Sequence, residues 1–231
     1  MVGLVFTMAP TVVTAQPSVT AQTDALAQAC PGAAAWLKDH AQSEKAMQER
    51  DDARSPTDAE LLAEILRRTD RDQEARHAYI SGGGDPRAAS RVEAIDEDNF
   101  RWFSALVKRQ GFPSVAQVGE VGVHRAWLLV QHSDAHPEFR AALLPVLTQR
   151  YAAGEFDATD LAKVIDRSLK RAGKPQRFGT QFDWMSRHFQ LPGETELRRF
   201  DSNREQLHLM SLEDYACFMN QQLAELNRSA D

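Results

Sequence analysis

The sequence has few cysteines, no excess of basic residues and no long apolar run, and each of these absences excludes a class of protein. Its 231 residues include only two cysteines, which excludes a small disulfide-stapled scaffold and a zinc finger built on cysteines. Basic residues are not in excess: 27 Lys and Arg face 33 Asp and Glu, and a net charge of −6 argues against a nucleic-acid partner. No apolar run approaches the roughly 20 residues that span a bilayer. With 42% hydrophobic residues, the chain is expected to form one ordinary globular domain with a short appendage.

The common catalytic motifs are also missing from the sequence. It has no Walker phosphate loop, no Gly-x-Ser-x-Gly elbow, no His-Glu-x-x-His helix and no dinucleotide-binding glycine fingerprint. The run Gly82-Gly83-Gly84 has no lysine after it and no strand before it, so we interpret it as a linker. We therefore expect no cofactor, and no reaction follows from a motif.

The first 23 residues carry no charged side chain. A mostly apolar stretch over residues 2–9 is followed by Val13-Thr14-Ala15, a pattern typical of a secretory signal cleaved before Gln16. We predict a signal peptide over residues 1–15 and a periplasmic or secreted protein. The stretch lacks the usual basic residues ahead of it, and the alternative is a disordered N-terminal tail.

Export would place both cysteines in an oxidising compartment, where disulfides persist. Cys30 lies near the predicted mature start and Cys217 lies in the last predicted helix, so a bridge would join the two ends of the chain. We predict this disulfide, and two separate buried thiols are the alternative.

Apolar residues recur at helical spacing through most of the chain. The predicted helices cover residues 33–50, 55–80, 86–110, 121–132, 137–154, 158–172, 201–209 and 211–226. The clearest start is Ser55-Pro56-Thr57-Asp58, with Ser55 as the N-cap and proline at the first position. We divide the chain into the signal peptide, an N-terminal helical extension at 16–54 and a helical domain at 55–231.

The pattern changes from helical to alternating near the end of the chain. Residues 176–182 alternate between polar and apolar, and residues 188–191 alternate again before Pro192-Gly193. This predicts one small β-hairpin near residues 176–192. The expected fold class is therefore mainly α, a single helical bundle-like domain with one hairpin.

Two imidazoles lie four residues apart in His132-Ser133-Asp134-Ala135-His136. Such a pair can bind a transition metal. Pro137 interrupts the geometry, however, and Asp134 is placed to cap the next helix, so we expect no metal. His132 follows an apolar run and is expected to point partly inward. It is either a core histidine bonded to backbone or a general base near neutral pH.

Other polar residues fall where the helical period requires apolar ones. Asp72 and Arg76 lie four apart on one predicted face, Asn99 lies on an apolar stripe, and Asp166-Arg167 borders another. A polar group on an inward face has to be paired or bound to a ligand. We therefore predict that these groups meet in a shared interior.

The segment 174–181 is rich in neutral hydrogen-bonding groups. Gln176, Thr180 and Gln181 supply donors and acceptors, and Gly179 permits a close approach to the backbone. Amide and hydroxyl groups favour recognition of a polar ligand over acid–base chemistry.

These residues resemble the pattern of an uncharacterised bacterial family, the domain of unknown function 6624, over about Asp72 to Leu223. The matching pieces are Asp72-Gln73 with Arg76, Asn99, Gly111-Phe112-Pro113, Val118-Gly119, Ala126, Gln131-His132, Asp166-Arg167, Gln176–Gln181, Asn203-Arg204 and Leu212–Tyr215. The family usually has Trp at 112 and Tyr at 178, where this chain has phenylalanine, so no role is implied for a hydroxyl at 178. His136 lies outside the pattern. The resemblance groups the residues and names no reaction.

Two functions are compatible with this grouping. The first is a cleft that binds a polar or anionic small molecule, with hydrolysis as the candidate reaction and His132 as the base, oriented by Asp166 or Asp72. The expected ligand-binding residues are Arg76, Asn99, Arg167, Gln176, Thr180 and Gln181. The second is a binding protein without chemistry, such as a periplasmic inhibitor of a toxin. Its acidic charge would suit a basic protein partner, and its polar cluster would stabilise the fold.

Overall fold

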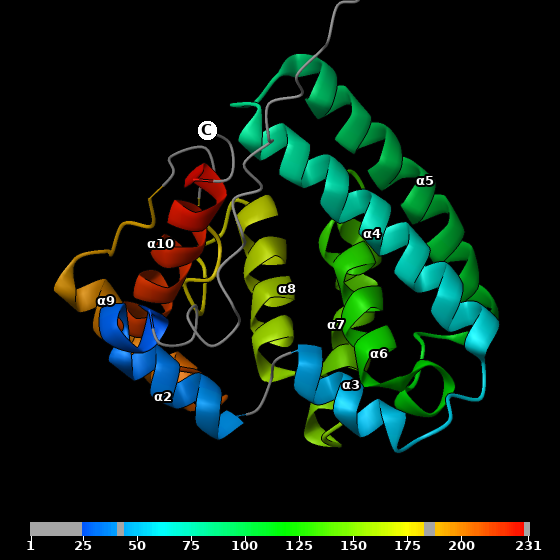
Figure 1. The fold of residues 1–231 in the computed structure, drawn as a ribbon, viewed down its shortest axis with the longest axis horizontal. Coiled ribbons are helices and arrows are strands. Elements are labelled where there is room, and N and C mark those ends of the chain that lie inside the picture. The colour runs from blue at the N-terminus through cyan, green and yellow to red at the C-terminus, as the bar shows by residue number, and fades with distance from the viewer. Residues whose placement is uncertain (1–24, 41–43, 183–187, 229–231) are drawn as a thin grey trace, which may run out of the picture.

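A computed structural model describes residues 25–40, 44–182 and 188–228, and Figure 1 shows how its helices are arranged. The helices are α2 Pro31–His40, α3 Glu44–Asp52, α4 Ala59–Ser81, α5 Pro86–Gln110, α6 Val115–Gln131, α7 Pro137–Ala152, α8 Ala158–Arg171, α9 Glu194–Glu205 and α10 Leu212–Arg228. The predicted mainly helical class is confirmed. None of the helices within these residues has both the length and the apolar composition needed to cross a bilayer. The predicted signal peptide lies outside the described residues.

Helix α6 is the centre of the larger group of helices. It contacts α3, α4, α5, α7 and α8, and α4 and α5 run side by side along one flank (Figure 1). Its core residues Val118, Ala126 and Val130 are completely buried, and Phe103 of α5 and Leu147 of α7 pack against them. This nearly all-round apolar surface explains why α6 is internal.

A smaller group contains α2, α9 and α10. Its core includes Phe189, Phe200 and Leu212, and Cys30, which comes just before α2, forms a disulfide with Cys217 of α10. The bridge links residues 187 positions apart, so the N-terminal extension is covalently attached to the last helix. The predicted helix over 33–50 is divided between α2 and α3, and residues 41–43 between them lie outside the described residues.

The start of α4 differs from the prediction because the preceding residues have other partners. Asp58, and not Ser55, is the N-cap, and its carboxylate accepts from the Leu61 N–H. The N–H groups of Thr57 and Asp58 donate to the carbonyls of Ala116 and Gln117 in α6. The segment 55–58 is therefore bound to α6 and does not form a helical first turn.

Helix α6 begins earlier than predicted and contains a kink at Gly119. Gly119 has φ +73°, and the N–H groups of Glu120 and Val121 that follow donate to the Asp51 carboxylate at 2.8 and 2.9 Å. A Cβ at position 119 would lie 2.4 Å from an Asp51 oxygen. Only glycine fits both the backbone conformation and this approach of α3.

The β-hairpin predicted over 176–192 is wrong. No strand forms in the described parts of this segment, and residues 183–187 lie outside them. The N–H groups of Arg177, Phe178 and Thr180, which a hairpin would pair across strands, donate instead to the Asp166 carboxylate at 2.7–3.0 Å. The alternating pattern arises because the chain wraps around one buried carboxylate, with Phe178 and Thr180 inward.

Candidate functional site

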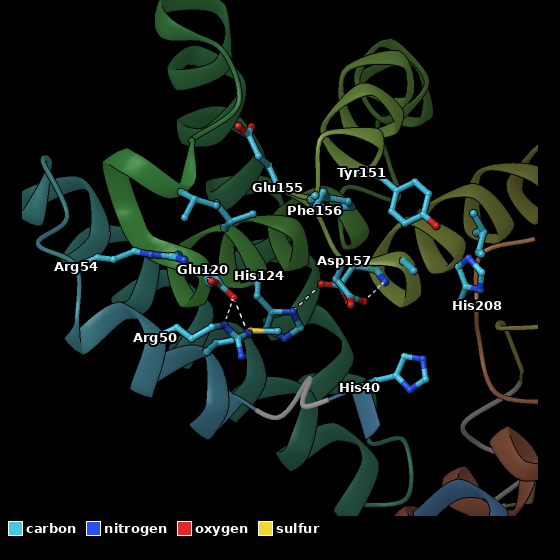
Figure 2. Close-up of a pocket in the computed structure, with 17 residues that line it drawn as sticks. His40, Arg50, Arg54, Glu120, His124, Tyr151, Glu155, Phe156, Asp157 and His208 are labelled. Atoms are coloured by element: carbon cyan, nitrogen blue, oxygen red, sulfur yellow. Dashed lines mark hydrogen bonds and ion pairs between the residues drawn. The ribbon is translucent and has the colours of Figure 1, made fainter. Parts of the chain in front are cut away.

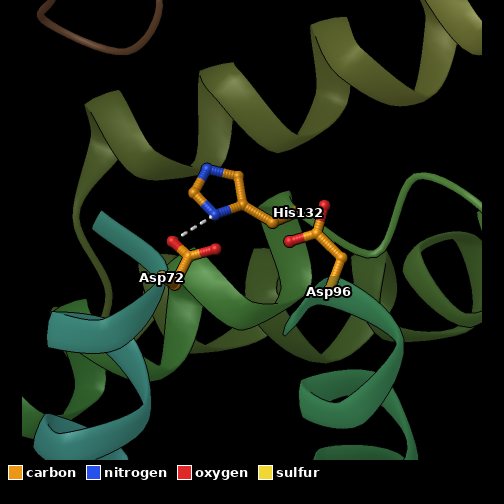
Figure 3. Close-up of side chains that lie close together, drawn as sticks. All are labelled: Asp72, Asp96 and His132. Atoms are coloured by element: carbon orange, nitrogen blue, oxygen red, sulfur yellow. Dashed lines mark hydrogen bonds and ion pairs between the residues drawn. The ribbon is translucent and has the colours of Figure 1, made fainter. Parts of the chain in front are cut away.

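Four of the polar side chains meet where α4, α5 and the end of α6 come together. We call Asp72, Arg76, Asp96 and His132 the His132 cluster; Figure 3 shows its two carboxylates and the imidazole. Asp72 and Arg76 share one face of α4, Asp96 comes from the neighbouring α5, and His132 is the C-cap of α6. The packing of α4 against both α5 and α6 brings the four together.

The geometry of the cluster is close and almost enclosed. His132 Nδ1 lies 2.8 Å from Asp72 Oδ2, and Arg76 Nε lies 3.0 Å from both Asp72 Oδ1 and His132 Nδ1. The other end of the Arg76 guanidinium donates to Asp96. The Asp72 side chain is 1% exposed, whereas those of Arg76 and Asp96 are 22% exposed, so the cluster opens to solvent on their side.

The tautomer of His132 follows from these contacts. Nδ1 cannot accept a proton from Arg76 and donate one to Asp72 in the same neutral ring. The Arg76 Nε–H already has the Asp72 carboxylate as an acceptor, so we assign the proton to Nδ1, donating to Asp72. Nε2 then carries the lone pair, and no described residue hydrogen-bonds to it.

The three titratable groups differ in protonation. Burial and the Arg76 charge lower the pKa of His132 to about 4, so the imidazole is neutral at pH 7. Burial raises the pKa of Asp96 to about 7, against the opposing effect of Arg76. Burial also acts to raise the pKa of Asp72, but the His132 hydrogen bond and nearby charges lower it well below its usual range. Such divergent values within one cluster are typical of functional sites.

The His132 cluster also contains a set of possible metal ligands. One ligand atom each from Asp72, Asp96 and His132 lies within 4.8 Å of the others. The Arg76 guanidinium lies among them and bonds to all three, so the cation that neutralises these groups is the protein's own. A metal would have to displace Arg76, and the absence of a metal stays our prediction. The other imidazole of the sequence pair, His136, hydrogen-bonds to Glu97 at 2.9 Å and stacks on Phe100.

A group of arginines lies next to the cluster. Asp134 accepts from Arg140 at 2.8 Å, Arg167 at 2.5 Å and Arg171 at 2.9 Å, and we call these four residues the arginine group. Three guanidinium groups and one carboxylate leave a net charge of +2. The predicted capping by Asp134 is wrong, because its carboxylate binds these arginines, while the N-cap of α7 is His136, whose side chain makes no capping bond.

Arg140 is the unusual member of the arginine group. Its side chain is completely buried, and its Nε and Nη2 have no hydrogen-bond partner among the described residues. Burial lowers its pKa, which the Asp134 hydrogen bond partly offsets. Buried donors without a partner are costly, so water or a ligand is the expected acceptor.

The loop 176–181 uses most of its polar groups internally. The Gln176 side chain donates to the Gln181 carbonyl at 2.7 Å and accepts from the Gln181 N–H at 2.8 Å, and the Thr180 hydroxyl donates to Asp166 at 2.9 Å. Only Gln181 reaches the arginine group, 3.5 Å from Arg167 Nη1. Asp166 therefore organises this loop, and Asp72 is the aspartate that contacts His132.

The remaining predicted site residue, Asn99, is buried but lies apart from the cluster. It accepts from Arg68 at 3.1 Å, beside Asp98. Asp96, one turn before Asn99 on α5, is a member of the cluster that the sequence pattern does not predict. Its position on a helix face was visible, but it begins the acidic run Asp96-Glu97-Asp98, which is typical of a solvated surface.

A separate cavity of about 700 Å³ lies beside the first half of α6, where it is lined by Glu120, Val123 and His124. Figure 2 shows the residues that line it. His124, Asp160, Arg50 and Glu120 line it, and none of the predicted site residues does. Large cavities are the usual ligand sites, but here the residues that carry the family pattern lie elsewhere. We therefore treat the two places as separate sites.

Comparison with known proteins identifies the family of the chain. The model of a family of unknown function, DUF6624, matches residues 59–225, and the resemblance found in the sequence is confirmed. No curated protein and no solved structure matches the chain. The matched range contains the His132 cluster, the arginine group and the loop, and it leaves out α2 and α3. The chain belongs to the family of unknown function DUF6624.

Proposed function

We propose that the His132 cluster and the arginine group form one site that binds a small anionic molecule and hydrolyses it. The observation that carries the proposal is a neutral imidazole held through Nδ1 by an ionised, buried aspartate, with Nε2 free of any described partner. Arg167 belongs to the arginine group and is close enough to His132 to affect its pKa. The base and the positive charge are therefore neighbours.

The arginine group would bind the anionic part of the molecule. Arg167 and Arg171 are 22% and 51% exposed, so they can contact a ligand while keeping Asp134 as a partner. Guanidinium groups suit carboxylates and phosphates because their planar N–H pairs match two oxygens. The Nε and Nη2 groups of Arg140, which have no described partner, would add hydrogen-bond donors to the site.

The His132 cluster would supply the proton transfers. Nε2 would accept a proton from a water molecule whose oxygen attacks the substrate, and the Asp72 carboxylate would stabilise the resulting imidazolium. Asp96, with a pKa of about 7, is protonated in part of the molecules at neutral pH and would donate to the leaving group. A proton passed from His132 to Asp96 through solvent would restore the starting state.

Anion binding would also correct the low basicity of His132. Part of the decrease in its pKa comes from the charges of Arg76 and Arg167, after the larger effect of burial. A bound anion offsets those charges and raises the pKa toward the neutral range, where a general base is most effective. The imidazole would thus become basic when substrate is present.

The alternative is that the polar residues only stabilise the fold of a binding protein without chemistry. The bonds of the Gln176 side chain to the Gln181 backbone, and those of Thr180 to Asp166, favour it, because they leave Gln176 and Thr180 little capacity for a ligand. The two proposals differ at His132. Its Nε2 has a role if the site binds a ligand or catalyses a reaction, and it has none if the polar residues only stabilise the fold.

The test compares His132→Gln with His136→Gln, a matched change at an imidazole outside the cluster. Para-nitrophenyl phosphate and the para-nitrophenyl monoester of succinate are the substrates, and phosphate and succinate are the ligands for thermal shifts. We expect His136→Gln to resemble wild type and His132→Gln to lose at least about 100-fold in rate, the usual effect of a general base. Equal rates in the two variants, or no hydrolysis by wild type, would contradict catalysis. No thermal shift with either anion would contradict the binding site.

We also propose that the protein acts outside the cytoplasm. The signal-like pattern of residues 1–15 supports this, and the bond between Cys30 and Cys217 is of a kind that persists in oxidising compartments. Mass analysis of the exported protein without reductant would find a chain beginning at Gln16 with no free thiol. Two free thiols would contradict the proposal.

A further inference from the structure

The cavity beside the first half of α6 lies between the N-terminal extension and the family domain. One wall comes from His40, Arg50 and Arg54, which precede the family match at residue 59, and the other from α6 and the start of α8. We call this outer cavity, of about 700 Å³, the outer chamber. Its size is within the range of small-molecule sites, roughly 300–1,000 Å³.

An inner chamber of about 180 Å³ adjoins the outer one. The two share the lining residues Met47, His124, Asp157 and Asp160, so the chambers are direct neighbours. The inner walls are mainly apolar and include Trp36, Leu37, Met210, Phe218 and Met219. A ligand that fills both chambers therefore needs a polar end and an apolar end.

The free hydrogen-bonding groups of the outer chamber are mainly donors. Arg50 and Arg54 both bind the Glu120 carboxylate, at 2.6–2.8 Å, and each keeps N–H groups that no described residue accepts. His124 Nδ1 lies 2.6 Å from Asp160 Oδ2, and its Nε2 has no described partner. Burial lowers the pKa of His124 but the Asp160 carboxylate raises it, and the net shift is upward.

Most carboxylates of the outer chamber are already occupied. Glu120 binds two arginines, Asp160 binds His124, and Asp157 accepts the first N–H groups of α8. Glu155 is exposed and lies apart from the others at the rim (Figure 2). The chamber therefore offers cationic donors to a ligand, while its carboxylates other than Glu155 are satisfied.

The inner chamber is held in shape before any ligand binds. Trp36 donates from Nε1 to the His208 carbonyl at 3.0 Å and stacks on His40, with ring centroids 4.0 Å apart. The disulfide at Cys30 attaches the same helix to α10. A preformed cavity favours binding because little conformational entropy is lost.

We propose that these two chambers bind a small monoanion with an apolar tail, a medium-chain carboxylate. The carboxylate lies against Arg50, Arg54 and His124 in the outer chamber, and the tail enters the inner chamber past Met47. The proposal is independent of the His132 site, because the two sites share no lining residue and one wall of this cleft, which includes Arg50 and Arg54, lies outside the family match.

The test measures octanoate binding to the full oxidised chain by calorimetry, with acetate and octyl glucoside as comparators. We expect octanoate to bind at least about tenfold more tightly than either, because acetate lacks the tail and the glucoside lacks the charge. Arg50→Gln is expected to weaken octanoate binding by about tenfold, and His132→Gln to leave it unchanged. Circular dichroism confirms that each variant is folded.

A second measurement locates the bound tail. Omega-bromooctanoate is expected to quench tryptophan fluorescence in wild type and to quench it far less in Trp36→Phe, which keeps the apolar wall. Several results would overturn the proposal: no saturable octanoate binding below about 1 mM, equal binding of octyl glucoside, or quenching that Trp36→Phe does not change. Loss of octanoate binding in His132→Gln would place the ligand at the other site and would also overturn it.

Discussion

Helix α6 and its C-cap carry two histidines in similar arrangements whose pKa values shift in opposite directions. His124 and His132 each bind a nearly buried aspartate through Nδ1, Asp160 at 2.6 Å and Asp72 at 2.8 Å. Burial is the largest influence on each imidazole and lowers its pKa. Nevertheless, the net pKa shift is upward at His124 and downward, to about 4, at His132.

The difference comes from the deeper burial of His132 and from the second set of neighbours. At His124, Asp157 adds to the effect of Asp160, and these carboxylates outweigh burial and Lys163. At His132, the cations Arg76 and Arg167 add to the effect of burial and outweigh Asp72. The pKa of the imidazole in a histidine–aspartate pair is therefore set by the groups around the pair and not by the aspartate alone. Of the two imidazoles, His124 therefore holds a proton more readily, and His132 offers a neutral acceptor.

The largest expected effect is the loss of the aspartate from each pair. Asp72→Asn is expected to destabilise the fold by about 3–5 kcal/mol, because Arg76 would lose its buried ionic partner. Asp160→Asn is expected to cost only about 1–2 kcal/mol, because His124 is more exposed and can lose its proton. Urea unfolding at pH 7 measures both. Equal losses would show that the two pairs are alike in spite of their different neighbours.

The next effect concerns the pH dependence of stability. The pKa of His132 is about 4 in the folded protein and near 6.5 when unfolded, so the unfolded state binds the extra proton and stability falls as pH decreases from 6.5 to 4. Asp96 acts in the opposite direction, because its pKa is raised from 3.8 to about 7 and its contribution is lost as pH rises. The two effects offset each other in wild type.

Asp96→Asn removes one of these opposing effects. We expect its stability to rise between pH 4 and 6.5 by about 3 kcal/mol more than that of wild type. Urea unfolding across this window measures the difference, and other titrating groups cancel because they are common to both proteins. Parallel curves for the two proteins would mean that Asp96 is ionised throughout the window.

The smallest expected effect is on the pKa of His132 itself. Arg76→Met removes the nearest cation, and we expect the pKa to rise by about one unit or more, which corresponds to about 1.4 kcal/mol. Titration of the imidazole resonances by NMR measures it, with His124 in the same spectra as the internal control. An unchanged pKa at His132 would assign the low value to burial alone and would weaken the contrast between the two histidines.

The site could be predicted only in part. Asp72, Arg76 and His132 were recognised because charged residues at apolar positions of a helix have to be buried with partners, and they do lie together. The same argument selected Asn99 and Asp166, which are buried with other partners. Helical periodicity indicates which face is inward, but it does not indicate which inward groups meet.

The misses have equally physical causes. The alternation of polar and apolar residues at 176–182 predicts a strand. A chain that curls around a carboxylate gives the same pattern, because it also places every second residue inward. Asp96 lies in an acidic run, which is typical of a solvated surface. The cleft at His124 could not be predicted because the N-terminal extension, which is distant in sequence, forms one of its walls. In each case a contact between distant segments decided the outcome.

The amino-acid order by itself determined the helical class, the approximate helices and the family, because each depends on residues close together in the chain. Only the tertiary structure decided which carboxylate each histidine meets, which cations surround it and where the cavities lie. Electrostatic interactions depend on distance and burial. Those are set by the packing of helices and not by spacing in the sequence.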